Sequence, residues 1–465
     1  MVWRSERDLK LKVFLVLALF VAGLFGGFVA GPVKAPTVTI KETQITTNTA
    51  DQFNPAIYGN IIVWADNRSG VYNIYMYDLS TSTETPITTK SVDQFNPKVY
   101  GNIIVWQDGE NGDTYMYDLS TSTETRITTN TGAGAGPAVY GDIIVWTDRR
   151  NGLWDIYMYD LSNSTEKRIT TNCAYQLWPD VYGDIIVWLD ERHDGGDIYM
   201  YDLSTSTEKR VTTNTADQWF PAVSGNIIVW EDNRNGNSDI YMYDLSTSTE
   251  KRVTTNTADQ EYPAVSGNII VWEDWRNGND DIYMYDLSTS TETPITTNTA
   301  DQGLADVYGN IIVWTDDRNG NSDIYMAELT ITPTPSDAIE KTEDIKTIVA
   351  DASQIPVSDF DGATNKVKDN RRNTLLNMLD EVIMDIEAAK ASTDPAFQKV
   401  AYQNATDQLN AILDKTDGCS ERGTPDTIGS GYTPDWITTC ASQAKIDPLI
   451  RDLITMVQTL LASIP

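Results

Sequence analysis

Large aromatic residues recur at two variable positions between a Gln and a Pro in a repeated segment of this sequence, and in nearby loops of the same repeats. The set comprises Phe53, Phe95, Trp154, Trp178, Trp219, Phe220, Tyr262 and Trp275. Aromatic rings beside Asp, Asn and Arg suit sugars, which stack an apolar face and form hydrogen bonds around their edge. These residues therefore predict a ligand-binding face. The alternative is that the rings plug a central channel and pack beneath loops.

Acidic residues recur as regularly. An Asp lies two residues after each repeated Trp, an Arg follows in most copies, and a second acid precedes the next strand, as in Asp232, Arg234 and Asp239. This order predicts an Asp–Arg–Asp clamp across the turn. The alternative is calcium, whose oxygen ligands cluster here; the candidates are Asp232, Asp239, Asp316 and Asp323. Because an Arg within the loop opposes a cation, we expect no cofactor, with calcium as the open alternative.

Catalytic chemistry has few residues on which to rest. The chain has one histidine, His193, so a nucleophile–His–acid triad or a His-based zinc site would need that residue. A Gly-x-Ser-x-Gly segment is absent from the sequence. Paired carboxylates for cleavage of glycosidic bonds stay open, because acids are numerous. We expect a protein that is not an enzyme, with a polysaccharide lyase or hydrolase as the alternative.

These residues are positioned by a repeat of about 42 residues, a period typical of solenoids and propellers. The tetrad Ile-Ile-Val-Trp marks each copy, and its tryptophans are Trp64, Trp106, Trp146, Trp188, Trp230, Trp272 and Trp314. Each copy reads as four short strands separated by turns rich in Asp, Asn, Gly and Ser. Four antiparallel strands per copy predict one propeller blade, so seven copies predict a mainly β, seven-bladed propeller over residues 36–331.

The two ends of the repeat predict how the ring closes. The segment Glu42–Asn48 matches a fourth strand with no blade before it, and the last copy stops near Glu328 without a fourth strand of its own. The N-terminal strand therefore fits the vacancy in the last blade. Closure of this kind removes the exposed sheet edges that favour aggregation.

The repeated pattern resembles a known family. Asp-Gln-x-x-Pro, then Gly-Asn-Ile-Ile-Val-Trp-x-Asp-x-Arg-x-Gly, then Asp-Ile-Tyr-Met-Tyr-Asp-Leu is similar to the TolB-type (WD40-like) β-propeller repeat, and it lacks the GH and WD dipeptides of WD repeats. The resemblance covers all seven copies and implies the fold. It does not fix an activity, because such propellers serve binding, gating and occasionally lyase roles. The sugar lyases among them imply a set of histidines that this sequence lacks.

The N-terminal residues 1–35 fall outside the repeat. Basic residues precede the apolar run Val13–Ala30, an order typical of a secretory signal. The run is also long enough for an uncleaved membrane anchor. We therefore expect an extracellular or cell-surface protein that contacts the membrane only through this segment.

The C-terminal part has a helical period. A Thr/Pro linker at residues 332–337 precedes a predicted α-helical domain at 338–465, with helices over 338–350, 371–389, 394–415 and 447–462 forming a small bundle. The segments 370–380, 415–419 and 435–440 resemble a helical module found at the ends of secreted archaeal and bacterial proteins, and this resemblance implies no reaction. In an exported protein, Cys419 and Cys440 are expected to form a disulfide.

Charge narrows the class of partner. The formal net charge is −33 and the isoelectric point is near 4.2, which excludes nucleic acid as a partner. The sequence therefore predicts an exported binding protein whose propeller face takes a glycan or a partner in the envelope or matrix. The alternatives are an extracellular polysaccharide-degrading enzyme and a purely structural envelope component.

Overall fold

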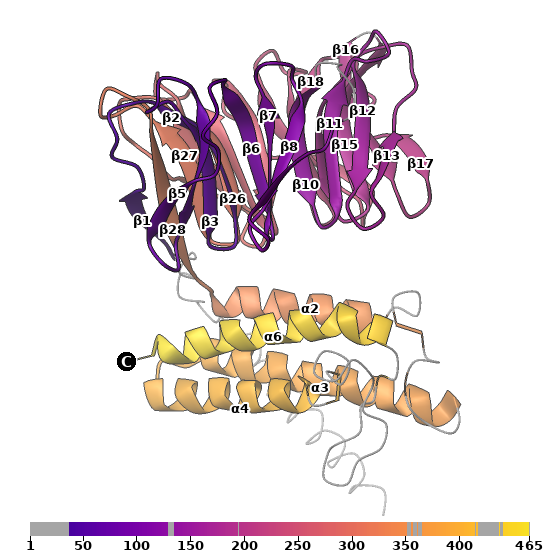
Figure 1. The fold of residues 1–465 in the computed structure, drawn as a ribbon. Helices are drawn as coiled ribbons and strands as arrows, with labels where there is room; N and C mark the ends of the chain where they lie inside the picture. The colour runs from indigo at the N-terminus through magenta and orange to yellow at the C-terminus, as the bar shows by residue number, and fades with distance from the viewer. Residues whose placement is uncertain are drawn as a thin grey trace, which may run out of the picture. The chain divides into compact units, whose positions relative to one another are not determined.

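The computed structural model describes residues 37–128, 134–193, 195–350, 355–356, 360, 365–413, 415–416, 437 and 440–464. The chain divides into two compact units, of which Val38–Thr330 is one and Ile331–Pro465 belongs to the other. The first unit consists of seven four-stranded antiparallel sheets (Figure 1). The predicted mainly β, seven-bladed propeller is therefore confirmed.

Each blade runs from an innermost first strand to an outermost fourth strand. The first strands are β2 (Gln52–Tyr58), β6 (Gln94–Tyr100), β10 (Gly134–Tyr140), β14 (Gln176–Tyr182), β18 (Gln218–Ser224), β22 (Gln260–Ser266) and β26 (Gln302–Tyr308). The second strands are β3 (Ile61–Asp66), β7 (Ile103–Asp108), β11 (Ile143–Asp148), β15 (Ile185–His193), β19 (Ile227–Asp232), β23 (Ile269–Asp274) and β27 (Ile311–Asp316).

The outer strands complete each sheet. The third strands are β4 (Asn73–Asp78), β8 (Thr114–Asp118), β12 (Asp155–Asp160), β16 (Gly195–Asp202), β20 (Asp239–Asp244), β24 (Asp281–Asp286) and β28 (Asp323–Thr332). The fourth strands are β5 (Thr83–Pro86), β9 (Thr123–Arg126), β13 (Thr165–Arg168), β17 (Thr207–Arg210), β21 (Thr249–Arg252), β25 (Thr291–Pro294) and, for the seventh blade, β1 (Thr37–Gln44).

Closure by the N-terminal strand is confirmed. In the seventh blade the strand order is β1-β28-β27-β26, so β1 supplies the fourth strand that the last repeat lacks. Just beyond β1, the backbone N–H of Ile45 donates to the carbonyl of Ile324 at 2.8 Å. The side chain of Glu42 also accepts a hydrogen bond from Arg318 in the last blade. The ring is therefore joined by both backbone and side-chain contacts.

The second strands form the core between blades. In β15, Trp188 packs with the preceding blade, while Val187 packs with Trp230 and Tyr241 of the following blade. Each tetrad tryptophan is 0% exposed. A continuous apolar run is expected for a strand covered on both faces, which explains why the tetrad does not alternate with polar residues.

The described part of the second unit contains four helices: α2 (Pro335–Ala350), α3 (Asn365–Ala391), α4 (Pro395–Leu413) and α6 (Cys440–Ala462). α2 and α4 each pack against both α3 and α6, around one apolar core. The predicted linker at 332–337 is shorter than expected, because β28 ends at Thr332 and α2 begins at Pro335. Proline is favoured in the first helical turn, so it starts the helix here.

The last helix begins earlier than predicted. Asp447 and Pro448 were expected at its start, yet α6 begins at Cys440 and continues through both residues. Ile446 and Ile450, on either side of the proline, are both fully buried in the core of the unit. Packing of these side chains outweighs the backbone hydrogen bond that a proline cannot donate.

Two predictions fall outside the described residues. Residues 1–35, the predicted signal or anchor, lie there, as do Cys419 and the side chain of Cys440, so the disulfide stays a prediction. Among the described residues, no helix combines the length and apolar character needed to cross a membrane.

Candidate functional site

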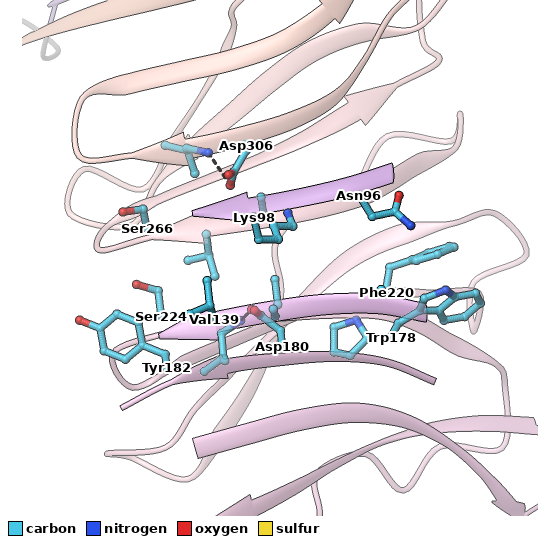
Figure 2. A pocket seen from close by; sticks show the side chains of 18 of the residues that line it. Asn96, Lys98, Val139, Trp178, Asp180, Tyr182, Phe220, Ser224, Ser266 and Asp306 are labelled. Atoms are coloured by element: carbon cyan, nitrogen blue, oxygen red, sulfur yellow. Dashed lines mark hydrogen bonds between the residues drawn. The ribbon is translucent and has the colours of Figure 1, made fainter. Parts of the chain in front are cut away.

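A cavity of about 770 Å³ runs along the propeller axis, and the seven first strands form its wall. Three levels of side chains line it, each made of one repeat position (Figure 2). We call them the mouth (Asn54, Asn96, Gly136, Trp178, Phe220, Tyr262 and Leu304), the waist (Lys98, Asp180 and Asp306) and the rim (Tyr58, Tyr100, Tyr140, Tyr182, Ser224, Ser266 and Tyr308). The waist position holds Ala in the other four blades.

A β-bulge in each first strand places the mouth residues. The register between first and second strands shifts at this point in every blade, as between Phe53 and Ala56. Every mouth residue has a positive φ, between 49° and 57°. Asn and Gly adopt this conformation readily, whereas aromatic residues and Leu are strained in it by about 1 kcal/mol or more.

The mouth has an aromatic half and a polar half. The Phe220 ring lies between Trp178, at a centroid distance of 4.3 Å, and Tyr262, at 4.6 Å. Trp178 and Tyr262 are 40% and 38% exposed. In the polar half, the Asn54 side-chain amide donates to the Asn96 side chain at 2.8 Å. The opening therefore presents stacking surface on one side and amide groups on the other.

In blades five, six and seven, the residue after the tetrad tryptophan supports the mouth of the next blade. The backbone N–H of Leu304 donates to Glu273 Oε1 at 2.6 Å, and that of Asn54 donates to Thr315 Oγ1 at 3.1 Å. Glu231 accepts from Ser238 Oγ at 2.8 Å and from the backbone of Tyr262. Burial raises the pKa of both Glu231 and Glu273 to about 7.

The waist carries charges inside the cavity. Asp180 Oδ2 accepts from the backbone N–H of Val223 at 2.8 Å, and Asp306 Oδ2 accepts from that of Ile57 at 3.0 Å, so each aspartate joins two neighbouring blades. Burial raises the pKa of Asp180 to about 6, against the lowering effects of the Val223 N–H and the Lys98 charge. The Lys98 ammonium forms no hydrogen bond or ion pair with the residues that the structure describes.

The rim is an incomplete ring of tyrosines. Five tyrosine rings follow one another at centroid distances of 4.3–4.6 Å, in the order Tyr308, Tyr58, Tyr100, Tyr140 and Tyr182. Ser224 and Ser266 occupy the position in the fifth and sixth blades, and their hydroxyls accept backbone N–H groups of Gly267 and Gly309 at 3.2 and 3.3 Å. The ring therefore has a gap two blades wide.

The eight predicted aromatic residues separate into two groups. Phe53, Trp178, Phe220 and Tyr262 line the cavity, while Phe95, Trp154, Trp219 and Trp275 do not. The ring centroid of Phe95 lies 5.9 Å from that of Tyr72, and the ring centroid of Trp154 lies 5.4 Å from the guanidinium carbon of Arg149. Trp219 is half-buried, and Trp275 is 49% exposed.

Sequence reasoning missed the waist and the rim. Lys98, Asp180 and Asp306 stand where four other blades carry Ala, and Ser224 and Ser266 stand where five carry Tyr. A comparison of the copies position by position would have identified both levels.

The predicted Asp–Arg–Asp clamp is wrong in its second acid. Arg234 Nη2 donates to Asp232 at 2.6 Å, but Arg234 Nη1 donates at 2.6 Å to Glu250, in the fourth strand of the same blade. Asp239 instead accepts from Arg252 at 2.8 Å. The residues are paired across strands of the sheet, rather than across the turn alone.

The four calcium candidates hold protein donors. Asp232 and Asp316 each accept from a tetrad tryptophan and from an arginine. Asp239 accepts from Arg252, and Asp323 accepts from Asn319 at 2.8 Å. In the described ranges, no group of three or more His, Cys, Asp or Glu side chains is arranged to hold a metal. Calcium binding stays the untested alternative to the expectation of no cofactor.

The single histidine lies away from the cavity. His193 is exposed at the end of β15, with its ring centroid 6.4 Å from that of Tyr199. It is not among the residues that line the cavity. Any chemistry in the channel would therefore use the waist groups rather than an imidazole.

Comparison with solved structures shows the fold. An oligogalacturonate lyase in complex with manganese matches with a TM-score of 0.51 at 15% identity, over 64% of this chain and 97% of that one. The oligogalacturonate lyase of Vibrio parahaemolyticus matches with a TM-score of 0.51 at 12% identity, over 66% of this chain and 99% of that one. A puromycin-hydrolyzing peptidase of Mycobacterium tuberculosis matches with a TM-score of 0.50 at 10% identity, over 62% of this chain and 53% of that one. No family model and no curated protein matches the chain.

Proposed function

We propose that this chain is a binding protein whose propeller takes a glycan at the mouth of the channel. The observation that carries the proposal is the row of Trp178, Phe220 and Tyr262, three adjacent, mutually tilted rings that line the cavity at strained backbone positions. Blades one to three place Asn54, Asn96 and Gly136 at the same position without such strain. Strain that recurs in neighbouring blades is expected where the side chains have a task.

The chemistry of the mouth suits a sugar. Trp178 and Tyr262 offer partly exposed faces for the apolar side of a sugar ring, while the Asn54 and Asn96 amides face it from the polar half. The cavity volume of about 770 Å³ lies within the range typical of ligand pockets. The waist beneath adds Lys98 and two carboxyl groups that are able to bind hydroxyls.

Calorimetric titration of the full chain against neutral, amino and acidic oligosaccharides tests the proposal. Trp178→Asn, Phe220→Asn and Tyr262→Asn remove the rings but suit a positive φ, so the fold is expected to persist. A double variant that combines any two of these three substitutions is expected to lose at least about tenfold in affinity, which is about 1.4 kcal/mol in binding free energy. Trp275→Asn, on an exposed tryptophan outside the cavity, is the matched control. Binding that is equal in the double variant and the wild type would refute the site.

The second candidate function is cleavage of a polysaccharide. Asp180 and Asp306 place two carboxyl groups in one cavity, and burial raises the pKa of Asp180 to about 6, a value suited to proton transfer. Incubating the same oligosaccharides with the chain and analysing the products by mass spectrometry separates the two functions. We expect no cleavage; cleavage that is lost in Asp180→Asn would favour the enzyme.

The proposal includes a location outside the cell or at its surface. The apolar run Val13–Ala30 after basic residues supports it. Mass spectrometry of the N-terminus of the protein from its native source distinguishes a cleaved signal from a retained anchor. If every saccharide fails to bind, an envelope or matrix protein partner or a structural envelope role replaces the glycan.

A further inference from the structure

The cavity passes from one face of the propeller to the other. Its lining includes the mouth, the waist and the rim. Of the glycines in the turns that follow the first strands, only Gly225 and Gly267 line it, and these belong to the blades whose rim residues are Ser224 and Ser266. The cavity therefore reaches the second face at the gap in the tyrosine ring.

In five of the seven blades, large and small side chains are distributed in opposite ways at the two ends, while blades four and seven hold large residues at both ends. In blades five and six, the mouth holds Phe220 and Tyr262 while the rim holds Ser224 and Ser266. In blades one to three, the mouth holds small residues and the rim holds tyrosines: Asn54 with Tyr58, Asn96 with Tyr100, and Gly136 with Tyr140. The open path thus slants across the propeller, from blades one to three at the mouth to blades five and six at the rim.

The length of the path exceeds one sugar ring. Mouth and rim positions are four residues apart on each first strand, as are Asn54 and Tyr58. A regular strand at about 3.3 Å per residue would make this separation roughly 13 Å, and the β-bulge at the mouth makes it shorter than that. A ligand that fills the path would pass between the mouth aromatics and the amides of Asn54 and Asn96, then the waist charges, and would reach the gap beside Ser224 and Ser266.

We infer that the rim gap beside Ser224 and Ser266 is a second contact site, reached through the channel by a linear, unbranched saccharide chain whose end enters at the mouth. This inference rests on the glycan function proposed above and names its ligand class. The waist groups Lys98, Asp180 and Asp306 lie along the path and bind hydroxyls of the intervening sugars. A branched saccharide is excluded from the path because the wall surrounds it.

Closing the gap tests the inference. Ser224→Tyr/Ser266→Tyr completes the tyrosine ring with the residue that the other five blades carry, and Ser266→Tyr alone serves if the double variant is unstable in a thermal melt. Ser224→Ala/Ser266→Ala is the matched control, since it removes both hydroxyls but keeps the gap open. The probes are malto-, cello- and xylo-oligosaccharides from two to six units, titrated by calorimetry against the full chain.

In the wild type and the Ala control, we expect affinity to rise at least about tenfold between the shortest and the longest oligomer of the series that binds. In the Tyr variants, short oligomers are expected to bind as before and the gain with length to disappear. A gain with length that survives in the Tyr variants, or affinity independent of length in the wild type, would overturn the inference while leaving the mouth site intact. Failure of these probes and of the amino and acidic oligosaccharides named above to bind would overturn both.

Discussion

Replacing Glu273 with Gln tests the charge state of a group that supports the mouth. The Glu273 side chain accepts the backbone N–H of Leu304 at 2.6 Å and is 8% exposed. Gly303 leaves room for it, because a Cβ at that position would lie 3.0 Å from Glu273 Oε1. A glutamine keeps the acceptor oxygen for Leu304 and removes the buried charge.

The size of the effect follows from the pKa. Burial raises the pKa of Glu273 from an ordinary value of 4.5 to about 7. An acid with a raised pKa binds its proton more tightly in the folded state, so its contribution to stability is complete below pH 4.5 and is lost as the pH rises through 7. The difference corresponds to about 3 kcal/mol in the free energy of unfolding.

Urea unfolding at pH 4.5, 6 and 8, followed by fluorescence of the buried tetrad tryptophans, measures this effect. Glu273→Gln is expected to match the wild type at pH 4.5 and to exceed it by about 3 kcal/mol at pH 8. Thr315→Val, which removes the uncharged support of Asn54, is the control and is expected to cost about 1 kcal/mol at every pH. A Glu273→Gln variant that is equally or less stable than the wild type at pH 8 would refute the raised pKa of Glu273.

Two further predictions concern charges elsewhere in the propeller. Arg234→Met leaves the fully buried Asp232 carboxylate without its counter-charge and is expected to lower the free energy of unfolding by about 3 kcal/mol. Glu250→Gln, at the exposed end of the same clamp, is expected to lower it by less than about 1 kcal/mol. Urea unfolding of the two variants measures the difference. Lys98→Ala removes a positive charge that lowers the pKa of Asp180, so that pKa is expected to rise above about 6 in an NMR titration of carbon-13-labelled aspartate; an unchanged or lower pKa would contradict the waist geometry.

The fold was predictable because it depends on features that every copy shares. The tetrad tryptophan fixed the period, and strand-forming residues separated by turn residues fixed four strands per copy. The closing strand was predictable from a mismatch of the two ends, Glu42–Asn48 before the first blade and Glu328 at the end of the last. Each of these inferences needs only the local sequence pattern and the number of strands and copies.

The candidate site was predictable only in part, because a β-bulge decides which side chain faces the axis. Of the adjacent pair Trp219 and Phe220, the second lines the cavity and the first does not. The register shift between Trp219 and Ala222, with Phe220 at positive φ, produces this difference. Simple alternation along a strand does not reveal a bulge, so the sequence identified the pair without ranking its members.

The ion pairs of the predicted clamp were also predictable only in part. Spacing along the chain placed Asp232, Arg234 and Asp239 near one turn, which was correct. Spacing did not reveal that Glu250, in the next strand but one, would approach the same guanidinium. Contacts across strands depend on register and on the face of each side chain, which a repeat pattern leaves undetermined.

In a closed ring of near-identical blades, each repeat position occurs seven times in equivalent surroundings. Residues shared by all blades therefore explain the scaffold. Residues that differ between blades are the ones able to make one side of the channel different from the other. Phe220 and Tyr262 narrow one side of the mouth in the same two blades in which Ser224 and Ser266 open the rim. Blades four and seven hold large residues at both levels, so the coupling of a large mouth residue with a small rim residue is confined to blades five and six. The coupling is the expected result if one elongated ligand passes both levels, which is why length dependence is the decisive property to measure.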